Sequence, residues 1–220
     1  MRLVVFDVDG TLVDSQHHIH AAMGFAFARA GLPAPSLAEV HAIVGLSLPL
    51  AVARLVPGID PAAAIQVVED YKDSFVSRRV KEDAPLFPGA RDSLMRLAGR
   101  EDVLVGLATG KGRRGIEVML DNHDLRGVFA TIQCADGHPS KPHPAMLAAA
   151  LDEAGVPAAR AVMIGDTTFD IEMACAAGVA ALGVGWGYHP AEALGAAGAH
   201  DVASDFAAMD AWIEDWTRDE

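Results

Sequence analysis

Short apolar runs recur along the chain, and each one is followed by a polar turn. The runs cover residues 3–8, 103–108, 128–132, 161–164 and 180–184. Short continuous runs of this kind are typical of parallel strands that are buried on both faces. Helical spacing of apolar positions lies between several of them, over residues 112–121, 144–154 and 168–177. The alternation predicts an α/β fold with a doubly wound parallel sheet, and the active site is expected at the carboxyl ends of the strands.

Residues 16–82 interrupt this alternation, because they contain no run that resembles a strand. Ile19, Met23 and Phe27 repeat at helical spacing, and further helical segments are expected over residues 46–56 and 62–80, between breaks at 31–35 and 57–61. We therefore predict a helical cap domain of residues 16–82. It is inserted into a core domain of residues 1–15 and 83–220, through linkers near Ser15 and Glu82.

Composition narrows the range of partners. The chain has 220 residues, of which 51% are hydrophobic and 21% are charged, and this balance is typical of a compact globular protein. A formal net charge of -13 argues against binding to nucleic acid or to an anionic membrane. Two cysteines and the lack of a long apolar segment favour a cytoplasmic protein. We expect either a monomer or a homodimer. An anionic substrate would need a local cation in so acidic a protein.

The first apolar run ends in a pair of carboxylates, Asp7 and Asp9, followed by Gly10. Strand geometry would point both side chains the same way. Two neighbouring carboxylates repel each other unless a cation or a shared proton relieves them, and oxygen ligands of this kind suit Mg²⁺. The pattern Asp-x-Asp-Gly is by itself equally typical of an ordinary turn at the end of a strand.

Polar groups at the ends of later apolar runs favour a metal-binding, catalytic role for these carboxylates over an ordinary turn. Thr109 follows the second run and precedes Gly110 at the start of a helix, where a hydroxyl and backbone amides could hold a phosphoryl group. Lys141 precedes another helix, and Asp166 and Asp170 follow the fourth run. The carboxyl ends of parallel strands meet at one edge of a sheet, so we expect these groups to converge.

These motifs resemble those of the haloacid dehalogenase superfamily of phosphohydrolases, in the subgroup similar to phosphoglycolate phosphatases with a cap inserted after the first motif. Residues 7–12 match the first motif, Thr109 the second, Lys141 the third, and residues 165–170 the fourth. The resemblance covers nearly the whole chain and implies a Mg²⁺-dependent phosphatase acting on a small phosphoester. One departure is Gly110, where relatives often have Asn after the Thr.

The resemblance also implies catalytic roles. Asp7 would attack phosphorus and form an aspartyl phosphate, and Asp9 would protonate the leaving oxygen and then activate water. Dehalogenases lack an acid at the position of Asp9, so its presence favours phosphoester chemistry. The implied ligands of Mg²⁺ are Asp7, Asp9 through its backbone carbonyl, Asp166 and Asp170. The implied phosphate- and substrate-binding residues are Thr109, Gly110, Lys111, Lys141, and Gly45 and Ser47 in a cap loop that dips toward the substrate.

Three alternatives remain open from the sequence. A sugar phosphomutase similar to β-phosphoglucomutase would share Asp7, Asp9 and the cap. A non-catalytic, phosphorylation-dependent signalling module would also combine acids with a Thr and a Lys, although such modules place the phosphoacceptor after the third strand. Arg54 and Arg79 are candidates for holding a substrate carboxylate, or are exposed helical residues.

Overall fold

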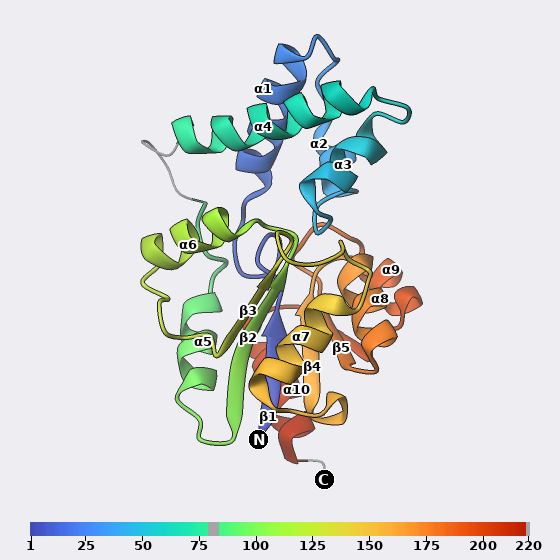
Figure 1. Ribbon diagram of the computed structural model, residues 1–220. Helices are drawn as coiled ribbons and strands as arrows, with labels where there is room; N and C mark the ends of the chain where they lie inside the picture. Colours follow the sequence, from blue (N-terminus) through green and yellow to red (C-terminus); the bar gives the residue numbers. More distant parts are fainter. Residues whose placement is uncertain (79–83, 219–220) are drawn as a thin grey trace.

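A six-stranded parallel sheet forms the centre of the molecule (Figure 1). The computed structural model describes residues 1–78 and 84–218, so Arg79 and the predicted linker at Glu82 lie outside the described residues. The strand order is β3-β2-β1-β4-β5-β6, which confirms the predicted α/β fold. The strands are β1 (Arg2–Phe6), β2 (Val103–Thr109), β3 (Thr131–Cys134), β4 (Ala161–Gly165), β5 (Ala180–Val184) and β6 (Asp201–Ala203).

Helices cover both faces of the sheet, which explains why the strands read as continuous apolar runs. In β1, Val4 and Phe6 pack against one layer of helices, and Leu3 and Val5 pack against the other. None of the helices in the described ranges is both long enough and apolar enough to cross a bilayer. The layer against Val4 and Phe6 contains α5 (Ala90–Ala98), α6 (Arg113–Asn122) and α10 (Phe206–Arg218). The layer against Leu3 and Val5 contains α7 (Ala145–Ala154), the short η1 (Ala158–Arg160), α8 (Thr168–Ala177) and α9 (Ala191–Ala197).

The third predicted strand was misplaced by three residues. The apolar run begins at Val128, but the strand begins at Thr131. Gly127 has a φ of 80°, and the N–H of Val128 donates to the carbonyl of Leu125 at 3.2 Å, so Val128 still belongs to the turn that follows α6. Helices α5 and α9 and the three-residue strand β6 were not predicted.

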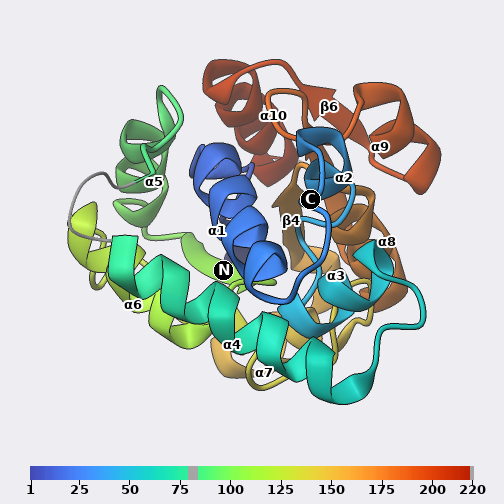
Figure 2. The same ribbon diagram turned by 90° about the horizontal axis from the view of Figure 1, so that it is seen from above.

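Helices α1 (Gln16–Arg29), α2 (Leu37–His41), α3 (Leu48–Leu55) and α4 (Pro61–Arg78) stand above the carboxyl ends of the strands (Figures 1 and 2). The helical segments expected in this stretch are present. They enclose their own hydrophobic cluster, which includes Met23, Phe27, Val40, Val52 and Val67. A separate cluster gives these helices a core of their own, because their apolar faces are buried against one another.

The chain enters and leaves this helical layer along neighbouring segments. An isolated antiparallel bridge joins Val13 to Leu86, and the N–H of Asp14 donates to the carbonyl of Pro85 at 2.9 Å. The two connections therefore run side by side, directly after the turn that follows β1.

Candidate active site

Three buried carboxylates meet at the carboxyl ends of the two central strands. Asp7 follows β1, Asp166 follows its neighbour β4, and Asp170 lies in the first turn of α8. One oxygen of each lies within 4.8 Å of the others, and all three residues are at most 1% exposed. Buried negative charges at this separation repel strongly, and hard oxygen donors are the ligands that Mg²⁺ prefers. The donor set therefore fits a magnesium ion.

Asp7 has one oxygen that the described part of the chain leaves without a hydrogen bond. The N–H of Val8 donates to Oδ1 at 2.7 Å, whereas Oδ2 has no such donor. Lys141 Nζ lies 3.0 Å from Oδ2 as an ion pair. Burial raises the pKa of Asp7 to about 6, although Lys141 lowers it, and repulsion from Asp170 adds to the rise. An unsatisfied buried oxygen is costly, so this atom is suited to meet a cation or a substrate.

Asp166 is held by donors that the sequence analysis did not assign. The hydroxyl of Thr11 donates to Oδ1 at 2.8 Å, and the backbone N–H of Tyr188 donates to Oδ2 at 2.9 Å. Burial, and then repulsion from Asp170, raises the pKa of Asp166. Gly10 packs so closely that a Cβ there would lie 2.2 Å from Oδ2, and its φ is +87°. The sequence could have indicated Thr11, because it belongs to the first motif. It could not have indicated the donor from Tyr188, because that donor is a backbone N–H.

Asp170 and Lys141 form a fully buried ion pair beneath the site. Lys141 Nζ lies 2.6 Å from Asp170 Oδ1, and the N–H and hydroxyl of Thr167 donate to Oδ2 at 3.1 and 2.7 Å. Burial lowers the pKa of Lys141, but Asp170 and Asp7 outweigh this effect and hold it above its usual value. Lys141 is therefore a fixed cation next to Asp7, as a phosphate site in an acidic protein requires.

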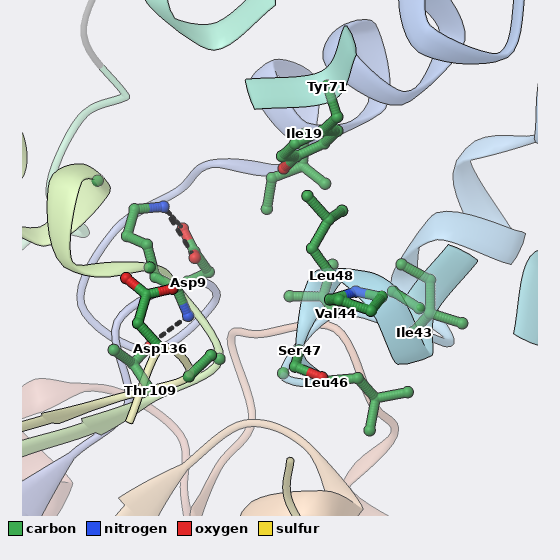
Figure 3. Close-up of a pocket in the computed structure, with 18 of the residues that line it drawn as sticks. Asp9, Ile19, Ile43, Val44, Leu46, Ser47, Leu48, Tyr71, Thr109 and Asp136 are labelled. Carbon is green, nitrogen blue, oxygen red and sulfur yellow. Dashed lines mark hydrogen bonds and ion pairs between the residues drawn. The ribbon is translucent and has the colours of Figure 1, made fainter. Parts of the chain in front are cut away.

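The carboxylate of Asp9 is not part of the triad and pairs with Lys111 instead. Its two oxygens lie 2.8 and 2.9 Å from Lys111 Nζ (Figure 3). Strand β1 ends at Phe6, so the side-chain alternation that would have aligned Asp7 with Asp9 does not extend to Asp9. Thr109 lies at the end of β2, and its hydroxyl accepts from the N–H of Lys111 at 3.2 Å. The second acid is thus held apart from the first and beside a cation.

The loop before α3 rests on the core at Gly110. A Cβ on Gly110 would lie 2.5 Å from the carbonyl oxygen of Gly45 and 2.7 Å from that of Leu46. Gly45 has a φ of +94°, and the N–H of Ser47 donates to the hydroxyl of Ser140 at 2.8 Å. A side chain at position 110 does not fit this arrangement, which accounts for the glycine at this position.

A cavity of about 500 Å³ lies between the strand ends and the helical layer. Its walls include seven of the predicted site residues, namely Asp7, Asp9, Gly45, Ser47, Thr109, Gly110 and Lys111. Lys141, Asp166 and Asp170 lie against Asp7 and do not line the cavity. Arg54 is not in the walls either, because its guanidinium stacks over the ring of Phe169 at 5.1 Å.

Known proteins resemble this chain in sequence and in fold. The family model described as haloacid dehalogenase-like hydrolase matches residues 4–184. The chain belongs to this family. A phosphoglycolate phosphatase from Pseudomonas savastanoi is 35% identical over 195 residues, which cover 86% of this chain and 71% of the relative. A probable phosphatase, IndB, from Dickeya dadantii is 34% identical and covers 93% of this chain and 90% of the relative.

A solved structure of a hydrolase from Pseudomonas syringae has the same fold as this haloacid dehalogenase-like hydrolase. Its TM-score is 0.87 at 24% identity, and the match covers 98% of this chain and 99% of the other. With the family match and the phosphatase relatives, the chain is an enzyme of the phosphatase type.

Proposed function

We propose that this haloacid dehalogenase-like hydrolase is a Mg²⁺-dependent phosphatase that acts on a small phosphorylated metabolite, such as a phosphoglycolate-like compound or a sugar phosphate, through an aspartyl phosphate on Asp7. The observation that carries the proposal is Asp7 Oδ2. This oxygen is buried, has no hydrogen-bond partner in the described chain, and lies 3.0 Å from Lys141 Nζ. Asp7 also lines a cavity of sufficient size for a small ligand.

In the first step, Asp7 attacks phosphorus and the ester oxygen leaves with a proton from Asp9. Lys141 balances negative charge on the phosphoryl oxygens, and the Thr109 hydroxyl and the Gly110 N–H donate to them. Lys111, which is paired with Asp9 in the free protein, supplies a second positive charge at the entrance of the site.

In the second step, water attacks the phosphorus of the aspartyl phosphate, the bond between phosphorus and the Asp7 oxygen breaks, and inorganic phosphate leaves. Asp9 is now a carboxylate and removes a proton from that water, which returns Asp7 to its starting state. The same side chain thus serves as the acid and then as the base.

Asp7, Asp166 and Asp170, with the backbone carbonyl of Asp9, are the residues that would hold magnesium. When bound, the ion supplies positive charge that offsets the repulsion between an anionic nucleophile and an anionic phosphate. Thr11 and Tyr188 fix the carboxylate of Asp166, and Thr167 and Lys141 fix that of Asp170. These partners keep the carboxylates oriented toward one another despite their repulsion.

We further propose that residues 16–82 are a cap domain on a core of residues 1–15 and 83–220. The paired connections at Val13 and Leu86 support a hinge at the base of the helical layer. Closure would exclude bulk water from the cavity. Small-angle scattering should show a smaller radius of gyration with Mg²⁺ and a phosphate analogue, and an unchanged curve would contradict the hinge.

The function is tested by measuring phosphate release from a panel of phosphoesters, with Mg²⁺ and with excess chelator. Release should require the metal and should vanish in Asp7→Asn. The control is Asp92→Asn, which changes an exposed carboxylate on α5 and should leave the rate unchanged. Full activity of Asp7→Asn would contradict the proposal. Conversion of a sugar 1-phosphate to its 6-phosphate without release of phosphate would instead indicate a mutase.

A further inference from the structure

The walls of the cavity differ sharply in chemistry between its two sides. The core side carries the polar groups, among them Asp9, Thr109 and Asp136 (Figure 3). The side formed by the helical layer is mainly apolar. Its apolar lining includes Ile19, Met23, Ile43, Val44, Leu48 and Val68, and all of these except Leu48 are at most 8% exposed. The polar lining residues of this side are Ser47, Tyr71 and Lys72.

The described cap residues offer little to bind a second charge on the substrate. Lys72 is the one lysine or arginine of residues 16–78 whose described side chain lines the cavity, and its Nζ lies 2.8 Å from Glu69 on the exposed surface of α4. Arg54, the sequence-based candidate for a substrate carboxylate, stacks on Phe169 outside the cavity. A carboxylate against the apolar side would lose its hydration without gaining a partner, which is costly.

The core side also disfavours a second anionic group. Lys111 lines the cavity beside Asp9, and the proposed mechanism already uses its charge for the phosphate. Arg114 also lines the cavity but is solvent-exposed. Asp136 adds a further negative charge to this wall and is fixed there by the N–H of Arg113 at 2.7 Å. The cavity of about 500 Å³ therefore has a buried phosphate site at Asp7, beside Lys141, whereas Lys72 and Arg114 lie on solvent-exposed parts of its wall.

We propose that the substrate is a singly phosphorylated molecule whose alcohol portion is uncharged and mainly apolar, and that it packs against Leu48, Val44 and Ile19 when the phosphate meets Asp7. This assignment rests on the proposed phosphatase function and names the substrate class of that same site. Apolar contact across such a wall stabilises the bound ester in proportion to the area removed from water. The phosphate and its cations fix one end, and the apolar side selects the other.

Two sets of esters test the assignment with the intact protein. Ethyl, butyl and hexyl phosphate have similar leaving groups, so differences in kcat/KM report contact with the cavity. We expect kcat/KM to rise by about four-fold for each added methylene until the cavity is filled. In 2-methylpropyl phosphate, two methyl groups replace the carboxylate oxygens of phosphoglycolate in nearly the same shape. We expect it to exceed phosphoglycolate in kcat/KM by about ten-fold or more.

A charge placed on the apolar wall should reverse this preference. Leu48→Lys introduces an ammonium group into the wall and should favour phosphoglycolate over 2-methylpropyl phosphate. Leu50→Lys changes a 36% exposed residue of the same helix that does not line the cavity, and it should keep the original preference. Circular dichroism spectra of both variants establish that they fold.

The results distinguish a wrong substrate class from a wrong function. If phosphate is released with Mg²⁺ but phosphoglycolate is the faster substrate, or the alkyl series shows no trend, the substrate class is overturned and the phosphatase stands. If no ester in either set releases phosphate, the proposed function fails and the substrate class fails with it.

Discussion

The carbonyl oxygen of Gly45 faces Gly110 so closely that a Cβ on Gly110 would lie 2.5 Å from it. The loop of the helical layer and the turn after β2, which we propose binds phosphate, thus meet backbone to backbone. Leu46, Ser47 and Leu48 follow Gly45 directly and line the cavity, so this contact sets where the loop stands relative to Asp7.

Gly110→Ala is expected to displace this loop. The added methyl group collides with backbone rather than with a flexible side chain, so the loop must shift, and we expect kcat/KM to fall by about ten- to a hundred-fold. Steady-state kinetics measure the effect. Gly137→Ala is the control, because Gly137 is exposed and a Cβ there meets no atom within 4 Å. Equal activity of the two variants would show that the contact does not position the loop.

The raised pKa of Asp7 predicts that the metal-free protein loses stability as the pH rises. Folding shifts this pKa from 3.8 to about 6, so the folded chain binds the proton more tightly than the unfolded chain does. The stabilisation is complete below the unfolded pKa and is lost as the pH rises through about 6. At neutral pH the ionised carboxylate lowers the free energy of unfolding by about 3 kcal/mol.

Asp7→Asn should remove this cost. In the presence of chelator, we expect the variant to have a higher Tm than the native protein at about pH 7.5, and the difference should shrink toward about pH 4. Added Mg²⁺ should stabilise the native protein more than the variant, because binding to the folded state alone raises stability. If the variant is less stable than the native protein at every pH, burial of the ionised Asp7 carboxylate does not destabilise the native protein.

Thr11→Val should weaken the magnesium site without touching a proposed ligand. The substitution keeps the shape of the side chain but removes the donor to Asp166 Oδ1. Loss of such a partner lowers metal affinity by about 10- to 100-fold, so the Mg²⁺ concentration for half-maximal activity should rise by that factor. Thr131→Val is the control. Thr131 lies on the edge strand β3, and its buried hydroxyl donates to Glu153, so its loss should leave this Mg²⁺ concentration unchanged.

Asp9→Asn should lower kcat by about 10²- to 10⁴-fold, because the amide cannot transfer the proton in either step. Asp136→Asn is matched to it, since Asp136 lines the same cavity but holds only the start of α6. We expect the control to retain activity within a few-fold. A similar loss in both variants would mean that the negative charge of the wall matters, rather than proton transfer by Asp9.

The sequence predicted the parts of the fold and site that depend on local pattern. Continuous apolar runs identified five of the strands, and polar residues at their ends identified Asp7, Thr109 and Asp166, because parallel strands bring such ends together. Strand β6 has only three residues, too few for a pattern. The apolar run at Val128 misled the analysis, because side chains of a turn can pack on the core as those of a strand do.

The remaining features depend on contacts between distant segments. The donor from Tyr188 to Asp166 is a backbone N–H, which every residue but proline carries, so no residue type reveals it. The apolar wall depends on which faces of the cap helices turn toward the core. The periodicity of Ile19 and Met23 shows a buried face, but it does not distinguish a face buried in the cluster from one that also lines a cavity.

The most direct test of the account is to find the phosphoryl group on Asp7. The protein is mixed with Mg²⁺ and a substrate that it hydrolyses, quenched in acid during turnover, digested and analysed by mass spectrometry. We predict one added phosphoryl group on the peptide that contains Asp7, and none in Asp7→Asn. A phosphoryl group on another residue, or turnover by Asp7→Asn at the native rate, would contradict the proposed mechanism.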